Sequence, residues 1–274
     1  MSADDTPDPT PHGLTLTGER TLPGIPDERY WFVRHEVAYR RVAARLDELD
    51  EPRGPAAGPT SGITVLDAGC GEGYGLALLA AAGAGRVIGA DLDPASVAHA
   101  RARYADTDPR IEVAACELSS LPLAAGEVDL TVSFQVIEHV WDVPGYLASL
   151  RRVTRADGLV AIATPNRLTF TPDSDVPVNP FHVTEFAPDE LVTALRTAGL
   201  DVERLSGLHH TGALAAFEAT HGVSLPRHLG ATDAASWSPA VRERVHATAA
   251  TDFVWRDDAL GSSLDLLAVC RVAA

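Results

Sequence analysis

A glycine-rich stretch, residues 65–75, carries residue types suited to binding a small charged ligand. Gly69, Gly71 and Gly73 stand where a strand must turn sharply into a helix while a ligand approaches the backbone, and side chains there would block the approach. In dinucleotide enzymes such glycines admit a pyrophosphate to the helix N-terminus. Here Glu72 lies among them, and its carboxylate would repel phosphate but could accompany an amine and a sulfonium. Charge therefore argues against NAD as the ligand.

An acidic residue follows at the distance expected for ribose binding. Asp91 ends the next apolar stretch, about 20 residues beyond the glycines, where one carboxylate can accept hydrogen bonds from both ribose hydroxyls. Glycine turn and acid together predict S-adenosylmethionine as the cofactor. The alternatives are a bare tight turn and a helix N-cap at Asp91, although Asp93 is better placed for capping. The predicted cofactor contacts here are Asp67, Gly69, Cys70, Gly71, Gly73, Asp91, Leu92, Glu117 and Leu118.

His139 is the candidate catalytic base. Methyl transfer is an in-line displacement, so the protein must align the acceptor oxygen and, for a neutral hydroxyl, remove its proton. A histidine, with an unperturbed pKa of about 6.5, suits that task and contributes about 10²–10⁴-fold. His139 follows an expected strand, residues 128–134, and is expected at the ligand-binding carboxyl edge of a sheet, with Glu138 as its catalytic neighbour. Gln135 is expected to touch the methionine moiety. The alternative is that Glu138 and His139 only begin a helix.

The same residues offer ligands for a divalent cation. Glu138, His139 and His182 together could hold a metal ion, expected to be Mg²⁺, that orients an acceptor hydroxyl. His182 ends a proline-bearing loop, residues 177–182, that could fold over the pocket. The pattern is similar to that of metal-dependent RNA 2′-O-methyltransferases, which have an acid where this chain has Gln135. A site without metal is therefore the alternative.

The elements that must position these residues alternate between apolar and amphipathic stretches, as a doubly wound α/β sheet requires. We therefore expect a Rossmann-like sheet with helices on both faces. The expected strands cover residues 63–68, 86–91, 111–115, 128–134, 159–163, 201–205 and 264–272. The expected helices between them cover residues 75–82, 94–104, 144–153 and 188–198.

An N-terminal helix, residues 27–49, is expected to cap the cofactor. Tyr30 and Trp31 would exclude water, and Arg34 or His35 would pair with the methionine carboxylate. The alternative is an aromatic staple beside a solvated arginine. The expected division is 1–60 for a disordered leader, cap helix and linker, 61–208 for the core, 209–261 for an insertion at the acceptor pocket or its lid, and 262–274 for the last strand.

Residues 65–75 with Asp91 resemble the seven-stranded class I methyltransferases. More narrowly, LTGERT (16–21), YWF (30–32), FQVIEH (134–139), TPNR (164–167) and NPFH (179–182) resemble actinobacterial enzymes that cap methylmannose polysaccharide precursors by 1-O-methylation. This resemblance implies seven strands with a reversed last strand, and as acceptor the reducing-end 1-hydroxyl of a short 3-O-methylated mannoside. The expected acceptor contacts are Asn166, His182, His209 and His210.

Two other functions are kept open. One is methylation of a different small molecule, such as a quinone, polyketide or amine. The other is a catalytically silent subunit that binds S-adenosylmethionine and regulates a partner. An NAD-dependent oxidoreductase is weaker, because no hydride-transfer residues accompany the glycines.

Composition limits the partners. A formal net charge of −16 over 274 residues repels phosphate backbones and anionic membrane surfaces, so neither nucleic acid nor membrane insertion is expected. Three cysteines without metal-ligand spacing fit a reducing compartment, and the acidic start is unlike an export signal. We expect a cytoplasmic enzyme that binds a small oligosaccharide and could form a homodimer.

Overall fold

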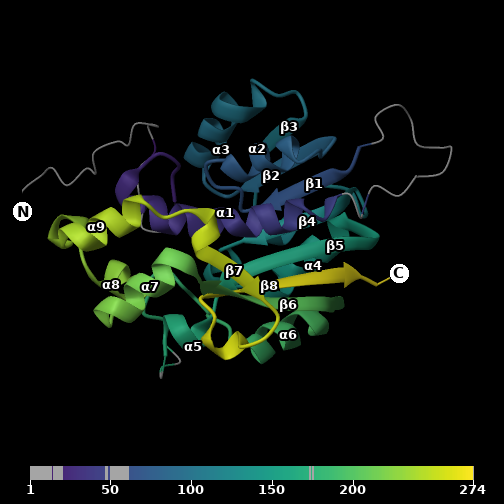
Figure 1. Cartoon of the computed structure of the whole chain (residues 1–274). Helices are drawn as coiled ribbons and strands as arrows, with labels where there is room; N and C mark the ends of the chain where they lie inside the picture. Colours follow the sequence, from purple (N-terminus) through teal and green to yellow (C-terminus); the bar gives the residue numbers. More distant parts are fainter. Residues whose placement is uncertain are drawn as a thin grey trace, which may run out of the picture.

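A computed structural model describes residues 14, 21–46, 49, 62–172, 174 and 176–273. The expected leader, most of the expected linker and residues 16–20 of the LTGERT stretch lie outside the described residues. One eight-stranded sheet in the order β3-β2-β1-β4-β5-β8-β6-β7 organises the fold (Figure 1). Its strands are β1 (Thr64–Ala68), β2 (Arg86–Asp91), β3 (Ile111–Ala115), β4 (Val128–Phe134), β5 (Thr154–Pro165), β6 (Leu200–His210), β7 (Phe253–Arg256) and β8 (Asp265–Val272).

The strand directions bring the predicted site residues to one edge. β1 to β5 pair in parallel, whereas β8 is antiparallel to both β5 and β6. The strand order reverses between β1 and β4, and ligands of open α/β sheets bind in the crevice outside the carboxyl ends at such a point. The glycine turn after β1, Asp91 at the end of β2 and His139 after β4 therefore share one edge.

The expected seven-stranded sheet is corrected to eight strands. The additional strand is β7, which lies inside the predicted insertion and pairs antiparallel with the last four residues of β6. β6 itself runs to His210, so the expected boundary at residue 209 falls within a strand. A four-residue edge strand is too short for a clear period-two pattern, and its hydrogen-bonding partner lies more than 40 residues earlier in the chain.

Helices cover both faces of the sheet, as expected. α1, α2 and α3 pack on one face, and α4 and α6 on the other. The helices are α1 (Arg29–Ala43), α2 (Tyr74–Ala81), α3 (Pro94–Ala100), α4 (Val143–Val153), α5 (Arg167–Phe170), α6 (Pro188–Thr197), α7 (Gly212–His221), α8 (Leu225–Ala231) and α9 (Pro239–His246). Short turns are η1 (Pro26–Glu28), η3 (Arg101–Ala105), η4 (Leu118–Ser120), η5 (Ile137–His139), η6 (Ala234–Ser236), η7 (Ala250–Asp252) and η8 (Leu260–Ser262).

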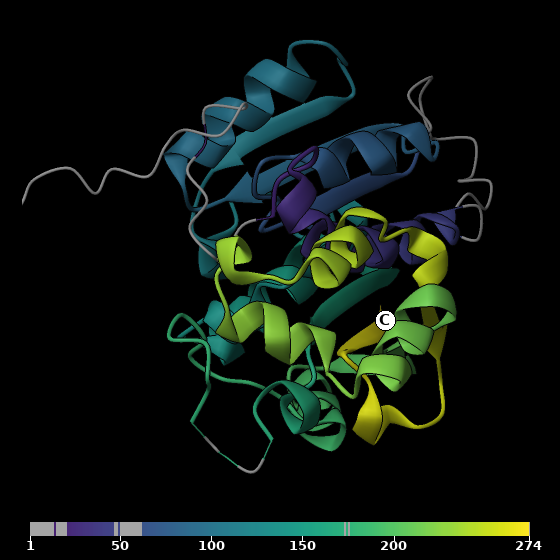
Figure 2. The same ribbon diagram turned by 60° about the vertical axis from the view of Figure 1, so that its left-hand side comes forward.

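The N-terminal helix α1 joins two cores. Ala38, Tyr39 and Val42 pack with α2 and the central strands. Tyr30 and Val33 pack instead with side chains of α7, α8 and α9. Figure 2 shows these three helices gathered beside α1, so α1 packs against both the sheet and the helical part of the predicted insertion.

Among the described residues, no helix combines the length and the apolar character needed to cross a membrane.

Candidate active site

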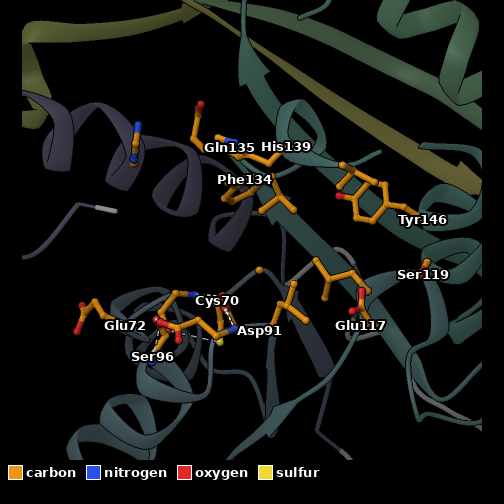
Figure 3. Close-up of a pocket in the computed structure, with 18 of the residues that line it drawn as sticks. Cys70, Glu72, Asp91, Ser96, Glu117, Ser119, Phe134, Gln135, His139 and Tyr146 are labelled. Carbon is orange, nitrogen blue, oxygen red and sulfur yellow. Dashed lines mark hydrogen bonds between the residues drawn. The ribbon is translucent and has the colours of Figure 1, made fainter. Parts of the chain in front are cut away.

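A pocket of about 610 Å³ opens at the carboxyl edge of the sheet. Its lining comes from the segments that follow β1, β2, β3 and β4, together with Thr21 and two side chains of α1. Figure 3 shows Cys70 and Asp91 on one side of the pocket and Phe134 and Gln135 on the other. Residues from four separate chain segments thus meet in one cavity.

The three glycines of the turn have different tasks. All have positive φ angles, +88° at Gly69, +53° at Gly71 and +100° at Gly73. A Cβ on Gly69 would overlap the Val136 side chain, and one on Gly73 would come within 2.8 Å of Tyr104. A Cβ on Gly71 would meet no heavy atom within 4 Å, and Gly71 lines the pocket. Gly69 also lines the pocket, whereas Gly73 serves as the left-handed N-cap of α2.

Asp91 is held by backbone donors rather than by a cation. Its Oδ2 accepts from Gly71 N at 2.8 Å and its Oδ1 from Asp93 N at 2.9 Å. The carboxylate is therefore oriented before any ligand arrives, and each oxygen keeps a second lone pair. The N-cap of α3 is Asp93, which accepts from Ala95 N and Ser96 N, so the capping alternative for Asp91 is wrong.

Four other residues that were predicted to contact the cofactor also line the pocket. Leu92 lines the pocket and is 60% exposed. Glu117, Leu118 and Cys70 line the pocket as well. Their role toward a cofactor stays a prediction.

The Glu72 side chain takes part in a buried hydrogen-bond network. It is 2% exposed and accepts from the Tyr104 hydroxyl at 3.2 Å, while His99 Nε2 lies 3.1 Å from its Oε2. Burial raises the pKa of Glu72, and His99 opposes that rise. Glu72 therefore anchors the glycine turn to α3 and η3.

Asp67 does not line the pocket. It is fully buried, and the Tyr39 hydroxyl donates to its carboxyl oxygens at 3.2 and 3.1 Å. Burial raises the pKa of Asp67 to about 7. Tyr39 itself lines the pocket, so Asp67 acts on the site through Tyr39 instead of by direct contact.

Of the two cap-helix residues predicted to pair with the methionine carboxylate, Arg34 does not reach the pocket. Arg34 is 3% exposed and its guanidinium is bidentate to Asp265, at 2.7 and 2.6 Å. Arg34 therefore has a carboxylate of the protein as its partner, which corrects its predicted pairing with the cofactor. Tyr30 is also fully buried, and its hydroxyl lies 2.8 Å from His210 Nε2, outside the pocket lining.

His35 and Tyr39, four residues apart on α1, are the side chains of this helix that line the pocket. Burial lowers the pKa of His35 to about 4, so the imidazole is neutral at pH 7. Tyr39 was missed from the sequence, although its spacing from His35 places both on one helix face.

The chain leaves β4 through a strained residue. Gln135 has φ +57°, a left-handed conformation that costs a non-glycine residue about 1–3 kcal/mol, and its N donates to Ala163 O at 2.8 Å. Gln135 and His139 line the pocket, as do Val140 and Trp141 after them. Strain at this position is consistent with a functional constraint on the β4 end.

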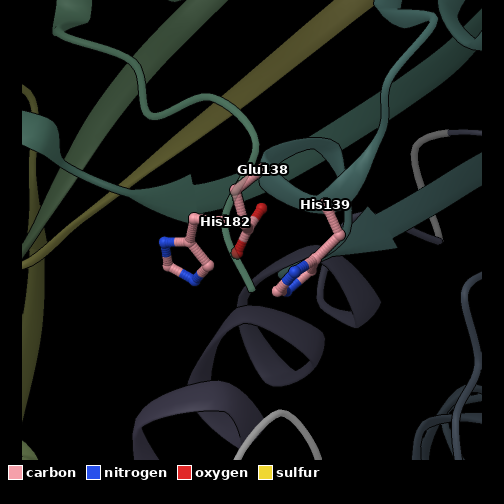
Figure 4. Close-up of side chains that lie close together, drawn as sticks. All are labelled: Glu138, His139 and His182. Atoms are coloured by element: carbon pink, nitrogen blue, oxygen red, sulfur yellow. The ribbon is translucent and has the colours of Figure 1, made fainter. Parts of the chain in front are cut away.

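Glu138, His139 and His182 come together, with their ligand atoms all within 4.8 Å of one another (Figure 4). Glu138 is 1% exposed and accepts from the Thr164 hydroxyl at 2.9 Å. Burial raises the pKa of Glu138 to about 8. The two imidazole rings stand edge to face, with centroids 4.9 Å apart.

Both imidazoles are oriented through Nδ1. His139 Nδ1 lies 3.1 Å from Phe181 O, and because a carbonyl only accepts, this nitrogen carries the proton. His182 Nδ1 lies 2.8 Å from Glu185 Oε1, which favours the same tautomer. Nε2 is then the nitrogen of each ring with a lone pair for a base or a metal ligand.

Three predicted acceptor contacts lie away from the pocket. Asn166 is fully buried; its Nδ2 donates to Leu260 O and Ser263 O, at 2.8 and 3.1 Å, and its Oδ1 caps α5. His210 lies between Tyr30 and Glu218. His209 precedes it on β6 and therefore faces the opposite side of the strand. None of the three lines the pocket, which corrects their assignment; only His182 lies beside it.

Comparison with known proteins identifies the family. A family model described as a methyltransferase domain matches residues 66–162. A protein of Mycolicibacterium smegmatis described as a probable S-adenosylmethionine-dependent methyltransferase is 43% identical over 264 residues, covering 94% of this chain and 95% of that protein. The chain belongs to the S-adenosylmethionine-dependent methyltransferases.

Two further comparisons agree. A Mycobacterium tuberculosis protein of the same description is 42% identical over 266 residues, covering 95% of this methyltransferase and 90% of that protein. A Haloferax volcanii methyltransferase, solved in complex with the Trm112 methyltransferase activator, superposes with a TM-score of 0.56 at 22% identity, covering 88% of this chain and 90% of that one. The structural likeness shows the fold, and the sequence relatives show the dependence on S-adenosylmethionine.

Proposed function

We propose that this methyltransferase transfers a methyl group from S-adenosylmethionine to a hydroxyl of a neutral sugar, with His139 as the general base. The observation that carries this proposal is the orientation of His139. It lines the cofactor pocket, and its Nδ1 donates to Phe181 O, which leaves Nε2 as the basic nitrogen. A neutral hydroxyl needs such a base, whereas the cofactor supplies the activated methyl group.

The charge of the pocket supports a neutral acceptor. Among the described lining residues there is no lysine or arginine, whereas Asp91, Asp93, Glu117 and Asp142 are all present. His35 adds no positive charge, because burial holds its pKa near 4. A phosphorylated or carboxylated acceptor would be repelled. Within neutral acceptors, the sequence resemblance points to the reducing-end 1-hydroxyl of a short 3-O-methylated mannoside, whose anomeric hydroxyl is more acidic than other ring hydroxyls.

The Glu138, His139 and His182 cluster also fits a divalent cation. Ligating histidines are typically held through their other ring nitrogen, as Phe181 O and Glu185 hold these two. Burial makes an ionised Glu138 costly, and a cation would offset that cost. Such an ion would lower the pKa of a bound acceptor hydroxyl. Two imidazoles and one carboxylate suit Mn²⁺, Fe²⁺ or Zn²⁺ better than the expected Mg²⁺, which prefers oxygen ligands.

His139 Nε2 cannot be base and metal ligand at once, so the metal requirement decides how this residue acts. The test is turnover of a synthetic 3-O-methylated mannobiose with labelled S-adenosylmethionine, with and without EDTA, followed by locating the new methyl group by NMR. Methylation at the 1-hydroxyl that survives EDTA supports the base role. If turnover is lost in EDTA and restored by Mn²⁺ or Mg²⁺, His139 acts as a metal ligand and not as the general base.

Other outcomes would remove the proposal. Turnover of a quinone or amine but not of any mannoside would assign a different small-molecule acceptor. Tight binding of S-adenosylmethionine without turnover on any acceptor would indicate a silent regulatory subunit.

A further inference from the structure

Two residues with exposed aromatic side chains flank the candidate base, one along the chain and one through a backbone contact. Trp141 is 88% exposed and lines the pocket two residues after His139. Phe181 is 51% exposed and lies outside the pocket lining, but its carbonyl oxygen accepts from His139 Nδ1. Covering an exposed aromatic surface with a ligand is favourable. We call Trp141 and Phe181 the aromatic rim.

The backbone on which each ring is mounted is fixed. Asp142, directly after Trp141, caps α4 by accepting from Gly145 N at 3.0 Å. Phe181 N donates to Asn179 Oδ1 at 3.0 Å, and Pro180 precedes it. A ligand that covers the two rings therefore has to order their side chains but not the backbone beneath them.

The surroundings of the aromatic rim select the kind of ligand. Asp142 and Glu117 line the same pocket, so an anionic ligand is disfavoured. A neutral sugar ring presents an apolar C–H face and polar hydroxyl edges, which match an aromatic surface beside carboxylates. A methyl ether on the sugar would enlarge that apolar face.

We propose that Trp141 and Phe181 form an acceptor subsite that stacks against the apolar face of the sugar whose hydroxyl reaches His139. This proposal rests on the proposed function, since it needs a sugar acceptor. It replaces Asn166, His209 and His210 with side chains that are open to a ligand. It assigns the discrimination between methylated and unmethylated sugars to the aromatic rim.

The test measures acceptor and cofactor binding separately. Isothermal titration of 3-O-methylated mannobiose into protein saturated with S-adenosylhomocysteine gives the acceptor Kd, and titration of S-adenosylhomocysteine alone gives the cofactor Kd. Trp141→Ala is expected to raise the acceptor Kd about tenfold and to leave the cofactor Kd unchanged. Trp141→Phe should recover most of the loss. Phe181→Ala should act in the same direction, and Val254→Ala, an exposed apolar residue on β7, is the control.

A second readout separates binding from chemistry. In Trp141→Ala the KM for the acceptor should rise while kcat stays near that of the wild type, and the preference for methylated over unmethylated mannobiose should shrink. A weaker cofactor Kd would instead assign Trp141 to the adenine. Unchanged acceptor binding in both rim variants, with wild-type turnover of the mannoside intact, overturns the subsite alone. A wild-type protein that binds no mannoside overturns the proposed function and the subsite with it.

Discussion

The cofactor side and the acceptor side of the pocket were not equally open to inference from sequence. On the cofactor side, Gly71 and Asp91 meet at the pocket because a strand-end bend and a neighbouring strand end bring them there. On the acceptor side, Asn166 and His210 were predicted to bind the acceptor, but they form hydrogen bonds with distant segments of the chain. A function that uses local backbone geometry can be read from spacing, whereas the partner of a polar side chain is chosen by the tertiary fold.

The largest expected effect is on the acceptor side, at His139. His139→Ala should lower kcat by about 10²–10⁴-fold, because the base is removed, while the Kd for S-adenosylhomocysteine stays unchanged. The measurement is initial rate against pH, with titration calorimetry for the cofactor. His221→Ala is the matched control, since its Nδ1 also donates to a phenylalanine carbonyl, Phe217 O at 2.9 Å, away from the pocket. Near wild-type rates across pH in His139→Ala would remove the base assignment.

The second largest effect is expected on stability, at Arg34, and it tests whether this residue is structural or binds the cofactor. Arg34→Leu leaves Asp265 buried without its cation and should lower the free energy of unfolding by about 3–5 kcal/mol. Denaturant unfolding measures the loss, and the double variant Arg34→Leu with Asp265→Leu should recover most of it. The cofactor Kd of the folded protein should not change. If the cofactor Kd instead rises strongly while the protein stays as stable as the wild type, Arg34 binds the cofactor directly.

Asp91 tests the cofactor side directly. Asp91→Asn keeps the shape of the side chain but removes its charge, so the Kd for S-adenosylmethionine should rise by roughly one to two orders of magnitude, the range for hydrogen bonds to a charged group. Asp233→Asn is the control, because Asp233 caps η6 and lies outside the pocket lining. Equal cofactor affinity in wild type and Asp91→Asn would break the ribose assignment.

The smallest expected effect is a change in pH dependence at Asp67. Its pKa is about 7 in the folded chain against an ordinary value of 3.8, so the folded state holds a proton that the unfolded state releases. Stability from this group is present below about pH 4 and is lost as pH rises toward 7. Relative to Asp67→Asn, the Tm of the wild type should therefore fall as pH rises over this window, at about 2–4 °C per kcal/mol of stability lost for a domain of 150–250 residues. Parallel Tm profiles would show that Asp67 ionises normally.

Much of the core was predictable because its strands are short apolar runs. Residues 86–91, 111–115 and 128–134 were expected as strands and are β2, β3 and β4 with those bounds. All seven residues of β4 are buried, although Asp129, Thr131 and Ser133 alternate with its apolar residues. β7 was missed, because it gains its hydrogen bonds from β6 across a long stretch of intervening chain.

By itself the sequence determined the glycine turn, the acid one strand away and the placement of Glu138 and His139 after a central strand, since each follows from local spacing and from parallel strands ending at one edge. Tertiary structure alone decided that Arg34 pairs with Asp265 and that Tyr39 rather than Tyr30 faces the pocket. The physical reason is that a buried polar group binds whichever complementary group packing brings within about 3 Å, and sequence distance does not limit that choice.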